Sequence, residues 1–305
     1  MALVYQDLGD LEQAKEYQQR ALKITLEKLG PKHADLATNY NNLTSIYKDL
    51  GDLQQAKGYQ ELALKIALDK LGPEHVDVAT NYKNLALIYK HLGDLEQAKE
   101  YQQRALKITL EKRGPEHVGV AISYNNLAHI YKDLGDLEQA KEYQQRALKI
   151  RLDKLGPEHV DVATNYNNLA LIYQDLGDLE QAKEYQQRAL KITLDKLGPE
   201  HVDVAINYTY LADIYQDLGE LEQAKEYQQR ALKITLDKLG PNHVNVATNY
   251  TYLTDIYQDL GDLEQAKEYR QRALNIRLDK LGPEHIDVAT NYNNLADIYQ
   301  DLGDL

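Results

Sequence analysis

The sequence of 305 residues contains no cysteine, tryptophan or phenylalanine, and only one methionine. The absence of cysteine excludes disulfide bonds, thiolate metal ligands and cysteine nucleophiles, and it suits a reducing compartment, so we predict a cytoplasmic protein. No uncharged stretch is long enough to span a bilayer, and the first ten residues contain neither a basic segment nor a long apolar run. We therefore expect no membrane as a partner.

Basic residues are too few to balance the acidic ones. The 35 lysines and arginines stand against 48 aspartates and glutamates, which gives a net charge of −13. Such a chain repels the phosphate backbone of nucleic acids as a whole. We expect no nucleic acid as a partner.

Proline is scarce, and its seven residues form one periodic series in which neighbours such as Pro31 and Pro73 lie 42 positions apart. Sixteen residues from Gly9, GDLEQAKEYQQRALKI, recur identically from Gly93, Gly135 and Gly177. An active site needs one asymmetric constellation of residues, so regular copies indicate architecture and not catalysis. We predict a single repeat array over residues 1–305, with a partial repeat at 1–32, full repeats from about 33, and a terminal unpaired helix at about 286–302.

One repeat, residues 159–200, reads as two amphipathic helices. Gly177 ends the first helix, Asp178 caps the second, and Gly198 with Pro199 ends the second. The apolar face of the first helix is formed by Val162, Tyr166, Leu169, Ala170 and Tyr173. That of the second is formed by Leu179, Ala182, Tyr185, Ala189 and Ile192. Neither helix can bury its face alone, so we expect the pairs to stack into an all-α solenoid.

The order of residues within this repeat resembles the tetratricopeptide repeat, as shown by Leu169, Ala170, Tyr173, Gly177 and Ala182. The longer period and the connector LDKLGPEHVD are similar to the 42-residue repeats of kinesin light chains and nephrocystin-3-like proteins. The resemblance covers essentially the whole chain. It implies a right-handed superhelical solenoid of antiparallel helix pairs. It also implies a non-catalytic scaffold that binds proteins or peptides on a concave surface lined by the first helices.

The recurring pentad PEHVD combines two carboxylates with an imidazole, which could form an acid–base group or a metal site. Its histidine recurs once per repeat where a helix begins, so we interpret it as a capping or packing residue. No glycine-rich phosphate loop, HExxH pair or nucleophile elbow occurs. We therefore predict no enzyme, no cofactor and no metal. The histidines in question are His33, His75, His117, His159, His201, His243 and His285.

The second helices are nearly copies of one another, whereas the first helices vary at a few surface positions. We predict that these positions form a ligand groove. Lysines in the first half would favour acidic segments, and aspartates with tyrosines in the second half would favour basic or aromatic ones. The alternative is that all of them are ordinary solvated residues. The first half contributes Asn42, Lys48, Lys83, Asn84, Lys90, Asn126, His129 and Lys132. The second contributes Asn168, Tyr210, Asp213, Tyr252, Asp255, Asn294 and Asp297. The resemblance to tetratricopeptide domains implies that the asparagines of this series hold the backbone of the ligand.

Two further hypotheses remain open. The repeat phase places incomplete units at both ends, so a second hypothesis is head-to-tail self-association through exposed terminal faces. Its predicted contacts are Leu3, Val4, Leu295, Tyr299 and Leu302. A third hypothesis is that the chain is the sensor region of a larger multidomain protein.

Overall fold

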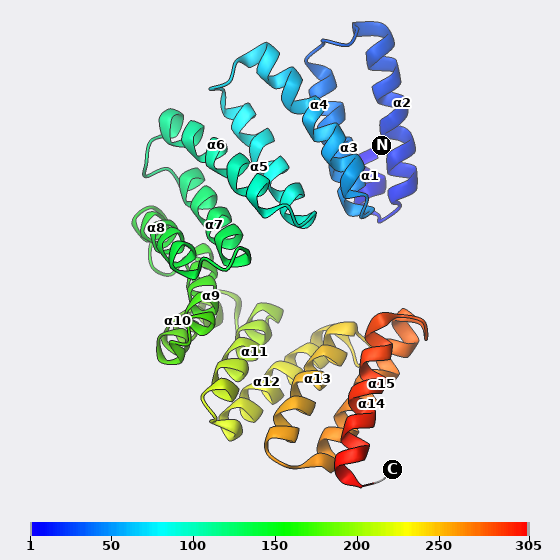
Figure 1. Cartoon of the computed structure of the whole chain (residues 1–305), viewed down its shortest axis with the longest axis vertical. Helices are drawn as coiled ribbons and strands as arrows, with labels where there is room; N and C mark the ends of the chain where they lie inside the picture. Colours follow the sequence, from blue (N-terminus) through cyan, green and yellow to red (C-terminus); the bar gives the residue numbers. More distant parts are fainter. Residues whose placement is uncertain (1, 304–305) are drawn as a thin grey trace. The chain divides into compact units, whose positions relative to one another are not determined.

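The computed structural model describes residues 2–303, and for residues 3 and 7 it describes the backbone alone. Every regular element in this range is an α-helix, and no strand occurs in it (Figure 1). The first helices of the pairs are α1 (Ala2–Asp7), α3 (Asp35–Asp49), α5 (Val76–His91), α7 (Val118–Asp133), α9 (Val160–Asp175), α11 (Val202–Asp217), α13 (Val244–Asp259) and α15 (Ile286–Leu302). The second helices are α2 (Leu11–Leu29), α4 (Leu53–Leu71), α6 (Leu95–Arg113), α8 (Leu137–Leu155), α10 (Leu179–Leu197), α12 (Leu221–Leu239) and α14 (Leu263–Leu281). The predicted all-α fold of consecutive helix pairs is confirmed.

The chain divides after Lys154 into two compact units. The first unit contains α1 to α8, and the second contains α9 to α15. Within each unit, the strong helix contacts are between helices that follow one another in the chain. The single domain expected from the repeat phase stays a prediction.

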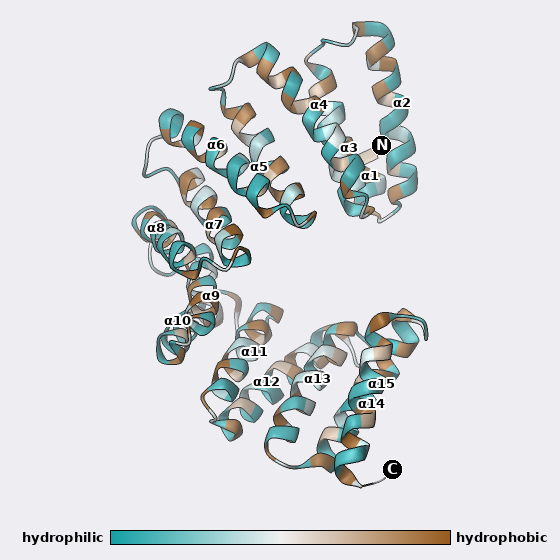
Figure 2. Cartoon of the chain, viewed as in Figure 1, coloured by the Kyte–Doolittle hydropathy of each residue, from teal (hydrophilic) through white to brown (hydrophobic). Residues whose placement is uncertain are grey.

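The helices are amphipathic. Figure 2 shows hydrophilic and hydrophobic residues interleaved along each of the ribbons, as a helix with one buried face requires. No helix within residues 2–303 has an apolar segment long enough to cross a membrane.

A glycine and an acidic cap join the two helices of a pair. Gly177 has a φ of 78°, in the left-handed region where a side chain would be strained. The carboxylate of Asp178 then accepts a hydrogen bond from the backbone N–H of Gln181 at 3.2 Å. This is the predicted N-cap of the second helix. Glu220 takes the same place before α12 and forms no side-chain cap.

The connector histidines cap the helices that follow them. Nδ1 of His201 accepts a hydrogen bond from the backbone N–H of Asp203 at 3.1 Å. The predicted capping role is therefore confirmed. Within residues 2–303, no three His, Asp or Glu side chains lie where they could hold a metal ion together. The same cap forms at His75, His117, His159, His243 and His285. His33 accepts the same hydrogen bond from Asp35, but the N-cap position of α3 is occupied by Ala34.

The hydrophobic core is built from three consecutive helices at a time. In the first unit, Leu64 of α4, Val78 and Leu85 of α5, and Ala105 and Ile108 of α6 form one buried cluster. The second unit repeats the arrangement with α12, α13 and α14. A helix pair thus completes its core only when the preceding second helix covers it, which is the physical basis of stacking.

Tyrosines supply the aromatic part of this core. Tyr101 of α6 lies between two tyrosines of α5, with ring centroids 5.8 Å from Tyr82 and 5.4 Å from Tyr89. The guanidinium of Arg104 lies 5.8 Å from the ring centroids of both Tyr82 and Tyr101, and it is paired with Glu100. A cation over an aromatic face is attracted by the ring quadrupole. This tyrosine–arginine–glutamate group recurs in later pairs, for example at Tyr166, Tyr185, Arg188 and Glu184.

One expectation about the last helix is wrong. Leu295 of α15 was expected to lack a helix that would bury it, but it is only 7% exposed and packs against Leu274 of α14. Tyr299 packs on the same cluster. The preceding second helix covers this face, and the exposed large hydrophobic residues of α15 are Ile286 and Tyr292 instead. Val4 of α1 is exposed, and the side chain of Leu3 lies outside the described residues.

Candidate functional site

Buried glutamines fix the distance between neighbouring first helices. Gln186 of α10 is fully buried, and its Nε2 donates hydrogen bonds to Asn167 of α9 at 2.7 Å and to Asn207 of α11 at 2.9 Å. Gln60 of α4 does the same between α3 and α5. A buried polar group that loses its partner costs about 1–3 kcal/mol. The network therefore holds adjacent first helices, and the side chains that they present, at a fixed spacing.

Several predicted groove residues contact the next repeat directly. Lys90 of α5 forms an ion pair with Asp133 of α7 at 3.1 Å. Gln174 of α9 donates to Asp213 and Asp217 of α11, at 2.7 Å and 2.6 Å. These pairs were not predicted from the sequence. The available signal was the sequence spacing. Asp213 and Asp217 each lie within a few residues of the position that is one full repeat after Gln174.

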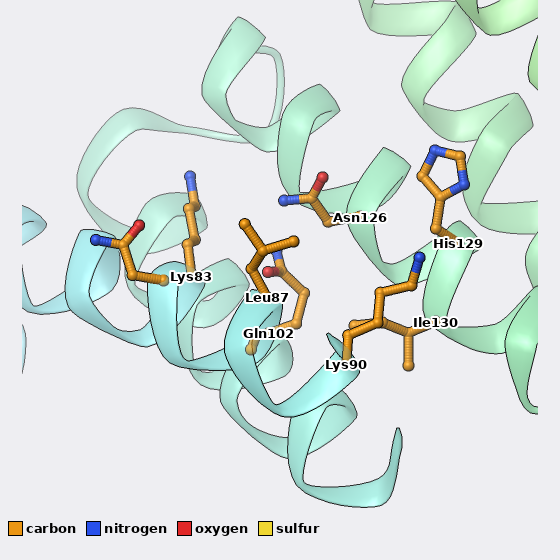
Figure 3. Close-up of a pocket in the computed structure, with 9 residues that line it drawn as sticks. Lys83, Leu87, Lys90, Gln102, Asn126, His129 and Ile130 are labelled. Carbon is orange, nitrogen blue, oxygen red and sulfur yellow. The ribbon is translucent and has the colours of Figure 1, made fainter. Parts of the chain in front are cut away.

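In the first unit, two first helices and the second helix between them enclose a pocket of about 230 Å³ (Figure 3). The pocket brings together five of the predicted groove residues, which are Lys83, Asn84, Lys90, Asn126 and His129. Its remaining lining residues are Ala86, Leu87, Gln102 and Ile130. The site therefore combines amines, amides and an imidazole with a small apolar surface.

The polar groups of this pocket are only partly satisfied. Burial lowers the pKa of the Lys83 ammonium, and within residues 2–303 that group has no hydrogen-bond or ion-pair partner. Burial also lowers the pKa of His129, the charge of Lys90 lowers it further, and Asp133 opposes the shift. Asn84 and Asn126 also line the pocket, and neither amide has a hydrogen-bond partner in the described chain. Such a site can bind an anionic group together with the polar backbone of a peptide.

The second unit presents a different set at the corresponding first-helix positions. Burial raises the pKa of the Tyr252 hydroxyl, and the charges of Asp213 and Asp255 and the neighbouring Tyr210 raise it further. The same physical cause, burial, raises the pKa of Asp213 and of Asp255. The four side chains thus form one acidic, aromatic surface across α11 and α13.

Arg270 of α14 lies buried beneath this surface and was not predicted from the sequence. It is 2% exposed and forms an ion pair with Asp255 at 2.9 Å, while its Nε has no hydrogen-bond partner among the described residues. Other second helices have a glutamine at this place, such as Gln186 and Gln228. That single departure from the repeat was the available signal.

The other predicted groove residues do not join either cluster. Asn42 donates to Gln18 of α2 at 3.5 Å. Lys48, Lys132, Asn168 and Asn294 are half-buried on their first helices, and Asp297 is exposed. A ligand groove that includes all fifteen residues stays a prediction.

Comparison with known proteins identifies one matching family model. The model of the tetratricopeptide repeat matches overlapping segments along the whole chain, at residues 1–69, 45–111, 77–153, 119–195, 161–237, 203–279 and 245–305. No curated protein matches the chain.

Solved structures of similar architecture support the same assignment. The crystal structure of BtubC (BKLC) from P. vanneervenii is 25% identical, with 75% of this chain and 92% of that chain covered and a TM-score of 0.64. A kinesin light chain-like protein of Podosopora anserina with nearly identical TPR-like repeats is 24% identical, with coverages of 68% and 98% and a TM-score of 0.60. The Cut9–Hcn1 hetero-tetramer of the APC/C is 16% identical, with coverages of 93% and 46% and a TM-score of 0.60. The last two identities show the fold alone.

Proposed function

The chain belongs to the tetratricopeptide repeat family, and on this premise we propose that it is a non-catalytic scaffold that binds segments of partner proteins. Repeats of this family generally form scaffolds for protein–protein interaction, and one structural neighbour is itself part of a hetero-tetramer. We place the binding surface on the side formed by the first helices, which the family resemblance predicts to be concave.

The observation that carries this proposal is the pocket between α5 and α7. Its Lys83 ammonium is half-buried and unpaired within the described chain, and the amides of Asn84 and Asn126 flank it. A cation kept without a counter-charge costs solvation energy, which an anionic ligand group would recover. An extended segment with an aspartate or glutamate fits, because each amide can both donate to and accept from its backbone.

A peptide array tests this proposal. Acidic, neutral and basic segments are compared for binding to the wild-type chain and to the Lys83→Glu variant. We expect acidic segments to be preferred and the variant to lose about tenfold or more in affinity for them. The matched control is Lys107→Glu, which makes the same charge change on the exposed side of α6. Equal binding by wild type and Lys83→Glu contradicts the proposal.

The acidic, aromatic surface of the second unit supports an opposite preference there. Tyr252 is 39% exposed, and Asp213 lies close enough to act on its hydroxyl. A lysine or arginine of a partner would find both a carboxylate and an aromatic face. In the same array, Asp213→Asn is expected to weaken the binding of basic segments. Asp195→Asn, on the exposed side of α10, is the control and should leave their binding unchanged. No difference between these two variants removes this part of the proposal.

Head-to-tail self-association is the second candidate function. The exposed apolar residues Ile286, 73% exposed, and Tyr292, 51% exposed, favour a contact on α15. Sedimentation over a wide concentration range tests it, with Tyr292→Lys as the variant that should weaken association. A strict monomer at all concentrations refutes it. A cytoplasmic location remains part of the proposal, and fractionation of expressing cells tests it.

A further inference from the structure

Two side-chain motifs recur on the second-helix side of the repeats. The first is an ion pair between a connector glutamate and a lysine near the end of the next second helix, as in Glu74 with Lys112 at 3.3 Å and Glu200 with Lys238 at 3.3 Å. The second is the glutamate–arginine pair that covers the core tyrosines, as in Glu100 with Arg104. The first motif neutralises the lysine, and the second places a charged side chain over the rings of the core tyrosines.

Both motifs are absent around α4. Lys32 stands in the first connector at a position where five of the other six connectors have glutamate and one has Asn242. Its counterpart Lys70 therefore faces a like charge. Gly58 and Leu62 replace the glutamate and the arginine that would cover Tyr40 and Tyr59. Three departures from an otherwise regular repeat therefore fall on one patch of the first unit.

A pocket of about 630 Å³ lies at this patch. Its apolar part is formed by Pro31, Tyr40, Leu62 and Ile66, of which Leu62 is 43% exposed. Its charged part is formed by Lys32, Lys65, Lys70 and Asp69. The volume lies within the range of pockets that take up ligands of a few hundred daltons.

The charges of this pocket are unbalanced. Three lysines stand against one aspartate, and none of the three has an ion-pair or hydrogen-bond partner within residues 2–303. At the equivalent position of later repeats, Lys112 and Lys238 are each neutralised by a glutamate. The site is thus an apolar floor with a cationic rim, and its complement is a bulky apolar group that carries negative charge beside it.

We propose that the pocket between the first connector, α3 and α4 is a second binding site, which takes a bulky apolar side chain of a partner segment flanked by carboxylates. The side chain packs on Tyr40, Leu62 and Ile66. The flanking carboxylates pair with Lys32, Lys65 and Lys70. This site is independent of the pocket between α5 and α7 and stands whether or not that pocket binds a ligand.

The test uses a fluorescein-labelled peptide of eight residues with one central phenylalanine flanked by aspartates, and it measures fluorescence anisotropy. All measurements are made in a chain that carries Lys83→Glu, which disables the other acidic-peptide site. We expect saturable binding that is lost when the aspartates are replaced by asparagines or the phenylalanine by glycine. Binding by either altered peptide as strong as that of the original peptide overturns the proposed chemistry.

Two variants restore the repeat pattern and should fold. Lys32→Glu recreates the ion pair with Lys70, and Gly58→Glu with Leu62→Arg recreates the pair that covers the tyrosines. A side chain fits at Gly58, because a Cβ there meets no atom within 4 Å. Each variant is expected to lower the affinity for the peptide about tenfold or more, with an unchanged circular dichroism spectrum. Unchanged affinity in both variants overturns the proposal.

Transplantation provides the converse experiment. Glu74→Lys, Glu100→Gly and Arg104→Leu together copy the pattern of the pocket onto the next repeat. We expect the number of bound peptides per chain to rise from one to two. Glu74→Lys alone is the control, because it adds the charge without the apolar floor. A stoichiometry that stays at one in the folded triple variant counts against the proposed pattern as the determinant of binding.

Discussion

Replacing Asp255 should destabilise the second unit far more than replacing its partner Arg270. The two side chains form one ion pair, but they are unequally buried: Arg270 is 2% exposed and Asp255 is 45% exposed. The Asp255→Leu variant leaves a buried guanidinium without a counter-charge. The Arg270→Gln variant leaves a carboxylate that water can reach.

The burial of the two side chains sets the magnitudes. Breaking a buried pair costs about 3–5 kcal/mol, and we expect about 3 kcal/mol for Asp255→Leu because removal of Asp255 lets water reach the end of the arginine. Arg270→Gln should cost about 1 kcal/mol or less, as for a solvent-screened carboxylate. The new glutamine can also donate to Oδ1 of Asn291, which has no hydrogen-bond partner in the part of the chain that the structure describes. Gln228 donates to Asn249 in this way at 2.7 Å.

The double variant Asp255→Leu, Arg270→Gln restores residues found in other repeats, such as Leu171 and Gln186. We expect it to be at most about 1 kcal/mol less stable than wild type, so the coupling energy between the two sites is about 2–4 kcal/mol. Urea unfolding followed by circular dichroism measures all four proteins, and hydrogen exchange in α13 to α15 reports local opening. Equal costs for the two single variants, or a double variant as unstable as Asp255→Leu, would refute the reasoning.

Three further predictions concern stability. His201→Ala removes the cap of α11 and should cost about 1 kcal/mol, whereas His201→Asn keeps a capping side chain and should lower the urea midpoint less; equal midpoints contradict the capping role. Gln186→Ala leaves two asparagine acceptors unpaired and should cost about 1–3 kcal/mol, with faster hydrogen exchange in α9 and α11, while Lys191→Ala on the exposed side of α10 should change neither measurement. Burial raises the pKa of Asp213 in the folded state, so its ionisation disfavours folding above the pKa of the unfolded chain. Asp213→Asn should therefore be more stable than wild type at pH 7, and this advantage should shrink as the pH falls through the carboxyl range; a pH-independent difference would contradict it.

Features that depend on neighbouring residues in the chain could be predicted from the sequence. The caps at Asp178 and His201 involve backbone groups two or three residues away, so the identity of a few residues determines them. The stacking of pairs followed equally directly from apolar faces that neither helix can cover alone. These local rules were sufficient for the fold class.

Features that depend on the register between repeats could not be predicted in the same way. The pair of Lys90 with Asp133 and the pair of Gln174 with Asp213 require knowledge of how far one first helix is displaced along the next. Leu295 was misjudged for a related reason, since the preceding second helix covers it. Arg270 was not predicted because the second helices are otherwise nearly identical. It replaces a glutamine of the buried network, and this one change adds a positive charge there.

The confinement of strong contacts to consecutive helices has a mechanical consequence. Under tension along the chain, each helix pair should detach without first disrupting distant parts of its unit, because few contacts bridge them. A released repeat of 42 residues, the distance from Pro157 to Pro199, adds about 140–150 Å of contour length at full extension. Near-identical interfaces such as those of α10 and α12 should yield at similar forces. Single-molecule extension would then record evenly spaced steps, because the repeats would unfold one at a time.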